Sequence, residues 1–281
     1  MLLAAAACTE QPAGEPVVRT TLDGKEITAE IVELPEAPAP APTRASACRS
    51  VSFEDTPLTH CIADPAQHSI AITYGPGDGS VPYGSLGAYA QGIEDTGRIA
   101  FAMNGGAFSD DLKPRGYLVA SGARLAELDR SDGPEGNSVS FFMRPNGVFF
   151  GDGGTWRILT ADRFYSTVSE RPQFGTQSGP MLLIEGERHP AIAEDGNSRA
   201  IRNAVGVDGA GRAHFVISDA PLSYGTLARF FSEELGVANA LFLDSKSSAL
   251  WDPATGRLDQ GRTGPIIVVK TRAQPAAGAA E

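Results

Sequence analysis

The sequence predicts an α+β fold, a single domain with a mixed, largely antiparallel β-sheet flanked by a few helices. Two observations lead to this class. Short apolar or alternating segments, bounded by Gly, Pro, Asn or Asp, recur along most of the chain, as strands do. Clear helical periodicity, by contrast, is confined to one segment. The pattern runs without a linker or repeat from about residue 48 to residue 270, so one domain is expected there.

The strand segments, in chain order, are short and rich in apolar residues. They are Ser69–Tyr74, Ile99–Met103, Gly116–Val119, Ser138–Met143, Val148–Gly151, Pro180–Ile184, Ala204–Val207, Ala213–Ser218, Ala240–Leu243 and Pro265–Lys270. Asn146-Gly147 is a favoured two-residue hairpin turn and predicts a hairpin between the strands on either side of it. A further strand is considered over Thr20–Glu33.

One helix is predicted over Thr226–Leu235, where the apolar residues lie at helical spacing. Ser223 is suited to cap its N-terminus and Gly236 to end it. The helix lies between two predicted strands, and a strand–helix–strand unit favours a parallel pair. A second helix is expected over Ser85–Glu94.

The overall charge argues against binding to nucleic acid. The chain has 281 residues and a formal net charge of −11, whereas phosphate contacts need clustered Lys and Arg. No segment reaches the ~20 apolar residues that a membrane-spanning helix needs. We expect a monomer.

The cysteines predict an oxidising compartment. Cys48 and Cys61 are interpreted as a disulfide, the alternative being two unrelated thiols in a reducing cytosol. Cys8 follows a run of Leu and Ala and resembles the lipidation site of a bacterial lipoprotein; the alternative is an unstructured N-terminus. We therefore expect a periplasmic or outer-envelope protein whose membrane contact, if any, is a lipid on Cys8.

The predicted organisation has four parts. Residues 1–8 are interpreted as the remnant of a signal peptide, and residues 9–47 as a disordered Pro/Ala-rich linker with a polyproline stretch over Pro35–Pro42. Residues 48–270 form the domain, and residues 271–281 form a disordered tail.

Polar clusters follow or precede several predicted strands, and alone each could be an ordinary turn. The clusters are Asn104-Gly105-Gly106, Gln177-Ser178-Gly179, Arg202-Asn203, Asp219, and Asp244 with Ser245, Lys246, Ser247 and Ser248. Together they predict chemistry at the strand ends, where glycines let the backbone approach a ligand and Arg binds anions. Zinc spacing, a phosphate-binding loop and a calcium loop are absent from the sequence, so no metal or cofactor is predicted. A divalent cation shared by Asp219 and Asp244 remains the alternative.

The order of these motifs resembles the phosphodiester glycosidase family, over about residues 47–269, and looks closest to a bacterial periplasmic branch. The blocks that carry the resemblance are Phe101–Gly106, Phe141–Phe149, Gln177–Leu182, Ile201–Val207, and Leu243-Asp244 with Ser247-Ser248. In much of that family the Asp is followed by glycines, whereas here Ser245 and Lys246 follow Asp244.

The resemblance implies hydrolysis of a sugar-1-phosphodiester at the glycosidic C–O bond. Arg202 would hold the phosphate, and Asp244 would act on the anomeric centre, with Asp219 as a second carboxylate. The substrate would be bound by Asn104, Gly105, Gly106, Gln177, Ser178, Gly179, Asn203, Lys246, Ser247 and Ser248. Two other interpretations stay open: a lipoprotein that binds glycans or glycophosphates without catalysis, and an envelope assembly protein that uses the linker to reach a partner.

Overall fold

The computed structural model describes residues 45–77, 80–120, 122–134, 140–244 and 247–273. The predictions for Cys8, the linker up to residue 44, Thr20–Glu33, Ser245, Lys246 and the end of the tail lie outside these residues. Residues 45–47 are already packed, since Ser46 Oγ donates to Asp252 Oδ2 at 2.6 Å and the Ala47 carbonyl accepts from Ile62 N at 3.0 Å.

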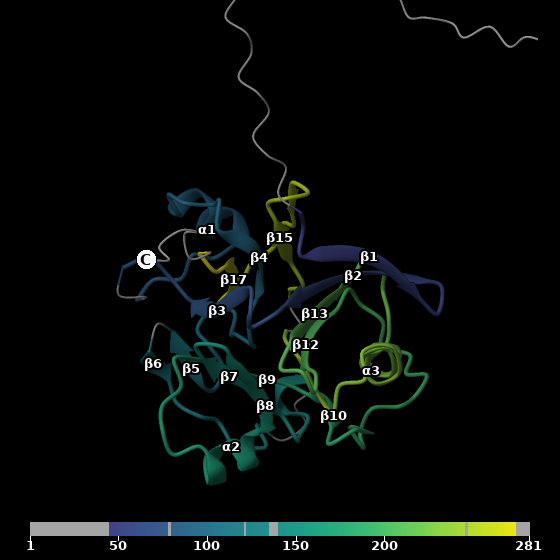
Figure 1. Cartoon of the computed structure of the whole chain (residues 1–281). Helices are drawn as coiled ribbons and strands as arrows, with labels where there is room; N and C mark the ends of the chain where they lie inside the picture. Colours follow the sequence, from purple (N-terminus) through teal and green to yellow (C-terminus); the bar gives the residue numbers. More distant parts are fainter. Residues whose placement is uncertain (1–44, 78–79, 121, 135–139, 245–246, 274–281) are drawn as a thin grey trace, which may run out of the picture. The chain divides into compact units, whose positions relative to one another are not determined.

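The strands form three sheets (Figure 1). The seven-stranded sheet has the order β1 (Cys48–Phe53), β2 (Thr56–Ala63), β13 (Ala213–Ser218), β12 (Asn203–Val207), β14 (Asn239–Phe242), β10 (Met181–Ile184) and β11 (Glu187–Arg188). One five-stranded sheet has the order β16 (Arg257–Leu258), β15 (Leu250–Asp252), β4 (Ile99–Asn104), β17 (Ile266–Thr271) and β3 (His68–Thr73). The other has the order β6 (Ala123–Ala126), β5 (Leu118–Ala120), β9 (Phe174–Ser178), β7 (Gly147–Asp152) and β8 (Thr155–Thr160).

The α+β class and the largely antiparallel sheet are confirmed. The pairings between the described strands are antiparallel. β13 and β14 do run in the same direction, but β12 lies between them and pairs with both, so the predicted parallel pair does not form. The inserted strand satisfies the backbone hydrogen bonds that the two would otherwise share.

The predicted strand over Ser138–Met143 is wrong, and so is the hairpin at Asn146-Gly147. Within it, Ser140–Phe142 forms the 3-10 helix η1. Asn146 instead stabilises the segment that precedes it, because its Nδ2 donates to the Phe141 carbonyl at 3.0 Å. β7 forms its hairpin with β8, where Gly153 adopts a φ of 36° that favours glycine.

Both predicted helices form. α1 spans Leu86–Gly92, and Ser85 caps it by accepting from Ala88 N. α3 spans Tyr224–Arg229, is capped by Ser223, and continues as a π-helix, η2, over Phe230–Glu234. Gly236, with a φ of 60°, follows the end of η2. A further helix, α2 over Ala161–Thr167, was not expected from the sequence.

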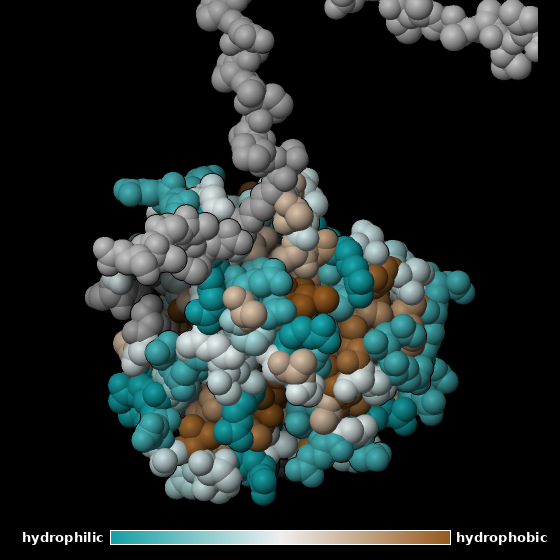
Figure 2. Space-filling view, in the orientation of Figure 1, coloured by the Kyte–Doolittle hydropathy of each residue, from teal (hydrophilic) through white to brown (hydrophobic). Residues whose placement is uncertain are grey.

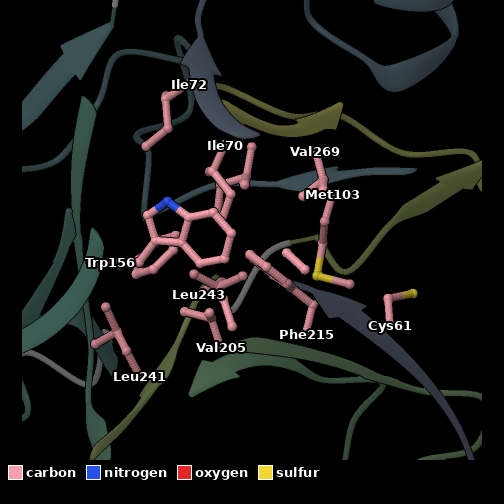
Figure 3. Packing of buried hydrophobic residues seen from close by; sticks show 14 of the residues in the cluster. Cys61, Ile70, Ile72, Met103, Trp156, Val205, Phe215, Leu241, Leu243 and Val269 are labelled. Carbon is pink, nitrogen blue, oxygen red and sulfur yellow. The ribbon is translucent and has the colours of Figure 1, made fainter. Parts of the chain in front are cut away.

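The three sheets share one central apolar core. Side chains from each sheet meet there, among them Phe215 and Val205 of the seven-stranded sheet, Met103 of β4 and Trp156 of β8 (Figure 3). The opposite face of each sheet packs on a helix: the seven-stranded sheet on α3 and η2, the β4 sheet on α1, and the β7 sheet on α2. Each sheet thus buries one face in the shared core and covers the other with a short helical segment, so few helices are enough to cover many strands.

The disulfide between Cys48 and Cys61 is confirmed. The two residues are direct partners in the register of β1 and β2, so the bridge joins the edge strand to its neighbour. On the face drawn in Figure 2, apolar groups are interspersed with polar ones. Among the described residues, the helices are too short or too polar to cross a membrane.

Candidate functional site

Polar residues of all three sheets meet where several strands end. In the seven-stranded sheet, β14 ends where β12 begins: Leu243 N donates to the Asn203 carbonyl at 3.1 Å. Asn104, the last residue of β4 in the second sheet, lies at the same place, because Asn203 Nδ2 donates to Asn104 Oδ1 at 2.7 Å. Ser178, the last residue of β9 in the third sheet, also lies there, because its hydroxyl donates to the Leu243 carbonyl. The structure therefore brings the predicted clusters at Asn104, Ser178, Asn203 and Asp244 together.

The two asparagines at this junction bond to the protein itself. Asn104 and Asn203 are both fully buried. Asn104 Oδ1 also accepts from Ala249 N at 2.9 Å, and the Ser248 hydroxyl lies 3.4 Å from Asn203 Oδ1. Ser248 Oγ is also 3.1 Å from the Ile201 carbonyl. This geometry gives Asn104 and Asn203 a positioning role, because their main hydrogen-bonding groups are already engaged.

Gln177 is likewise used internally. Its Oε1 accepts from Tyr117 N and Asp129 N, both at 2.9 Å, and its Nε2 donates to the Asp129 carbonyl and to Asn146 Oδ1. These contacts satisfy the amide, so Gln177 holds the segment at Asp129 against β5 and β9. It does not present a free amide to a ligand in this geometry.

The predicted glycines approach other parts of the backbone rather than open space. A Cβ at Gly106 would lie 2.2 Å from the Gln177 carbonyl oxygen, and one at Gly105 would lie 3.0 Å from that of Pro265. A Cβ at Gly179 would lie 2.7 Å from Cβ of Asn146. These glycines allow the strand ends to pack closely.

Asp244 lies buried at the end of this arrangement, with 3% of its surface exposed. Its Oδ2 accepts from Ser247 N at 2.9 Å, so the carboxylate holds the backbone at Ser247. Gly261 lies against the same residue, since a Cβ there would be 2.9 Å from Ser247 Oγ. Alternation along β14 predicts that Asp244 follows Phe242 on the sheet face that also carries Arg202.

Arg202 is a buried cation, with 4% of its surface exposed. Its Nε donates to the Leu222 carbonyl at 3.1 Å, and its Nη2 lies 3.0 Å from both the carbonyl and the hydroxyl of Ser198. The guanidinium stacks on Tyr224, 3.6 Å from the ring centroid. Burial lowers the pKa of Arg202, and the neighbouring Tyr224 opposes this shift. Among the described residues, no carboxylate forms an ion pair with it, and its hydrogen bonds to Leu222 and Ser198 use Nε and Nη2.

A pocket of about 460 Å³ opens beside this guanidinium. Arg202, Tyr224 and Ser198 form one wall, and Met143 and Ser140 form another, together with the loop from Ala191 to Ala200. Apart from Arg202, sequence reasoning missed these residues. The available signal was the Gly196-Asn197-Ser198 turn just before Arg202, which resembles many surface loops.

Asp219 lies at the same edge of the sheet but is separated from Asp244. It follows β13, and β12 lies between β13 and β14, so the backbones of the two strands are about two strand spacings, ~10 Å, apart along the sheet. Asp219 pairs with Arg257 Nη1 at 2.9 Å and accepts from Thr59 Oγ1 at 2.8 Å. Its role as a second carboxylate stays a prediction.

No metal site is evident in the part of the chain that the structure describes: His, Cys, Asp and Glu residues do not gather there in groups of three or more that could hold an ion.

Comparisons with known proteins agree with the motifs. The family model described as phosphodiester glycosidase matches residues 97–269. The uncharacterized protein YigE of Escherichia coli (strain K12) is 34% identical over 169 residues, which cover 60% of this chain and 64% of YigE. The chain therefore matches less than two thirds of that relative.

The comparison with solved structures includes an enzyme with a similar fold. It is the zebrafish N-acetylglucosamine-1-phosphodiester alpha-N-acetylglucosaminidase catalytic domain, auto-inhibited by its pro-peptide. The TM-score is 0.54 at 17% identity, and the match covers 80% of this chain and 82% of that one. A hypothetical protein from Synechocystis matches with a TM-score of 0.48 at 17% identity, over 80% of this chain and 61% of its own.

Proposed function

The chain belongs to the phosphodiester glycosidase family, and from that premise we propose that it hydrolyses the glycosidic bond of a sugar-1-phosphodiester in cell-envelope or extracellular glycans. The observation that carries the proposal is Arg202, a buried cation that forms no ion pair with the described residues and lines a pocket beside the junction of strand ends. The zebrafish enzyme, as its name states, acts on a phosphodiester of this class, which supports the choice of substrate.

A buried cation without an anionic neighbour is costly, and an anionic ligand offsets that cost. Arg202 is such a cation among the described residues, and its hydrogen bonds to Leu222 and Ser198 are to uncharged groups. A phosphodiester supplies one negative charge and acceptor oxygens for a guanidinium. The bonds to Leu222 and Ser198 and the stacking on Tyr224 fix the guanidinium before the ligand arrives. Arg202 would therefore bind the phosphate.

Asp244 supplies the carboxylate that the reaction needs. Cleavage at the glycosidic carbon builds positive charge on the sugar ring, and a carboxylate stabilises that charge, attacks the carbon or activates water. The phosphate leaves as a weak base, so demand for a general acid is lower than it is with an alcohol. Asn104, Ser178 and Asn203 would act through their hydrogen bonds, by holding the strand ends on which Asp244 and Arg202 lie.

The test uses N-acetylglucosamine 1-(methyl phosphate) and the corresponding esters of other sugars. Asp244→Asn should lower kcat about 100-fold or more, in the range that catalytic carboxylates contribute. Arg202→Ala should mainly raise KM, because it removes the cation that binds the phosphate. Asp252→Asn is the matched control, since Asp252 is also a buried carboxylate, with 2% of its surface exposed, and lies on β15. An unchanged kcat in Asp244→Asn or an unchanged KM in Arg202→Ala would contradict the assigned roles.

A second candidate is binding of glycans or glycophosphates without hydrolysis. The pair Ser245-Lys246 favours it, because side chains there replace the glycines that are common in the family. Calorimetric binding of the same esters, lost in Arg202→Ala and without hydrolysis of any of them, would support this candidate instead.

We propose that the protein works in the periplasm or the outer cell envelope. The disulfide supports this location, because disulfides persist in oxidising compartments. A lipid on Cys8 would tether it to a membrane, and Cys8→Ser would then release the full-length protein from the membrane fraction of the producing cells. Membrane association that survives this substitution would contradict the tether.

A further inference from the structure

We propose that the substrate is an oligosaccharide or a longer glycan, and that its sugar units beyond the scissile phosphodiester bind a second pocket beside α2. This inference rests on the proposed function and extends it from a single linkage to a chain. The second pocket measures about 660 Å³, which is larger than the one at Arg202. Its lining comes from β6, α2 and the segments next to them, and these elements are labelled in Figure 1.

Two aromatic side chains that line the pocket, Tyr117 and Phe164, are packed against buried aromatic residues. Tyr117 packs against Phe164 with 4.9 Å between ring centroids, and Phe164 packs on Phe150 at the same distance. Tyr165 of α2 lies on the wall with 66% of its surface exposed. The guanidinium of Arg130 lies 4.3 Å from the centroid of that ring. A large exposed aromatic side chain on a pocket wall offers apolar surface to a ligand.

The polar groups of this pocket suit a mainly uncharged sugar chain. Arg124, Arg130 and Arg171 are present together with Glu127 and Glu170. Arg124 already pairs with Glu127 at 3.1 Å, and Arg130 pairs with Asp162 at 2.8 Å. The pocket is therefore close to neutral, which argues against a polyanion. Planar guanidinium and carboxylate groups can bind the hydroxyl groups of a sugar, while its C–H face packs on an aromatic ring.

The two pockets are linked through neighbouring residues. Met143 lines the pocket at Arg202, and the next residue, Arg144, donates to the carbonyl of Arg130, which lines the second pocket. Arg144 Nη2 also lies 2.5 Å from Oδ2 of Asp162, the carboxylate that pairs with Arg130. The segment at Met143 and Arg144 therefore lines one pocket and contacts a residue that lines the other.

Gln177 ties the same pocket to the candidate site. It holds both the N–H and the carbonyl of Asp129, which lies between the pocket residues Leu128 and Arg130. The next residue, Ser178, donates to the carbonyl that directly precedes Asp244. A sugar chain bound beside α2 would thus rest on a wall fixed to the strand ends that carry the proposed chemistry.

The test compares substrates that share one scissile bond and differ in length. The short probe is N-acetylglucosamine 1-(methyl phosphate). One long probe adds N-acetylglucosamine units on the sugar side of the bond, and the other adds them beyond the phosphate. We expect one long probe to have a KM about 10-fold lower than the short probe, the effect of one well-placed contact. Tyr165→Ala and Arg171→Ala should remove that gain and leave the short probe unchanged.

Arg49→Ala is the matched control, because Arg49 is an exposed arginine on β1, in a different sheet. The inference is overturned if neither long probe gains over the short one, or if the pocket variants affect short and long probes equally. Should none of the probes be hydrolysed, the proposed function fails, and calorimetry with the same probes decides the inference separately. Weaker binding of a long probe by Tyr165→Ala would then retain the second pocket, and equal binding would overturn it.

Discussion

At the scale of single residues, Asn104 joins two sheets. Its Oδ1 accepts from Asn203 Nδ2 at 2.7 Å and from Ala249 N at 2.9 Å, in a place that water does not reach. Asn104→Ala would leave both donors unsatisfied, so we expect a loss of about 2–4 kcal/mol in the free energy of unfolding, measured with urea. Ser248→Ala should cost less, because its bond to Asn203 is longer, at 3.4 Å. Equal losses would contradict the central place of Asn104.

A buried histidine should make stability depend on pH. Burial, the neighbouring His214 and Arg49 lower the pKa of His60 to about 4. His60 Nε2 lies 3.0 Å from His214 Nδ1, and His214 Nε2 lies 3.0 Å from Asp208 Oδ2. Unfolded His60 takes up its proton near its ordinary pKa of about 6.5, so protons favour the unfolded chain between that pH and pH 4.

We therefore expect the contribution of His60 to be fully present above about pH 6.5 and to be lost as the pH falls to 4, by about 3 kcal/mol. Urea unfolding at several pH values measures the loss. His60→Gln should flatten the curve over that range, and an unchanged slope would contradict the assignment. Asp208 should not obscure the result: burial opposes its ionisation, but hydrogen bonds from His214 and Arg212 lower its pKa to about 2, below this range.

The sequence predicted roles for Asp244, Arg202 and Asn104 because each lies next to an apolar strand segment, and local pattern is enough to single out such residues. Local pattern does not show what a side chain contacts. Gln177 looked suited to a ligand, yet its amide is bonded to Tyr117, Asp129 and Asn146, which are distant in sequence. The pocket beside Arg202 was missed for the same reason, since Met143 and Tyr224 meet there only after folding.

At the scale of elements, the packing of η2 on β12 depends on a glycine. A Cβ at Gly206 would lie 2.8 Å from Cδ1 of Phe231 and 2.9 Å from Cγ2 of Val237, both buried. Gly206→Ala should therefore force the helix from the sheet and cost about 1–3 kcal/mol. In thermal unfolding this corresponds to a decrease in Tm of about 2–4 °C for each kcal/mol in a domain of this size.

Gly209→Ala is the matched control for Gly206→Ala. It lies in the turn after β12, and a Cβ there would meet nothing within 4 Å. Restricting the unfolded chain should leave stability unchanged or raise it by about 0.4–1 kcal/mol. If Gly206→Ala and Gly209→Ala shift Tm by the same amount, the contact with Phe231 is not the reason why position 206 requires glycine.

Helices and strands could be predicted where the sequence features that specify them lie close together in the chain. The helix after Ser223 combines a cap, apolar spacing and a final glycine, and all of these lie within one short segment. The false strand over Ser138–Met143 has the apolar content of a strand, but Phe141 is drawn into a turn by the amide of Asn146. That bond joins a side chain to a carbonyl five residues earlier, a contact that the apolar content of the segment does not indicate.

At the scale of the whole molecule, the sequence predicted an antiparallel α+β domain but one sheet in place of three. The alternation of apolar and polar residues in a strand segment indicates which side chains are buried. It does not indicate which distant strand will pair with that segment in the sheet. β2, for example, pairs with β13 about 150 residues later, through Cys61 and Phe215 among others. Such pairings are decided by the shared core, where all three sheets meet (Figure 3).

The disulfide should make the stability of the whole domain depend on redox state. It closes a loop with a sequence separation of 13, and the chain-entropy model gives about 3 kcal/mol for a loop of this size. β1 pairs with β2 at the edge of the seven-stranded sheet and has no fully buried residue, so the covalent bond adds to a weakly packed strand. Reduction with dithiothreitol should lower Tm by about 6–12 °C.

The double variant Cys48→Ala, Cys61→Ala should start from the lower Tm and should no longer respond to dithiothreitol. It retains Cys8, so any remaining response would report that thiol instead of the bridge. Equal Tm values for the oxidised and reduced wild-type protein would contradict a stabilising role. Because a reducing cytosol would remove this contribution, the size of the shift also bears on the proposed envelope location: a loss of several kcal/mol is a large part of the marginal stability of a domain.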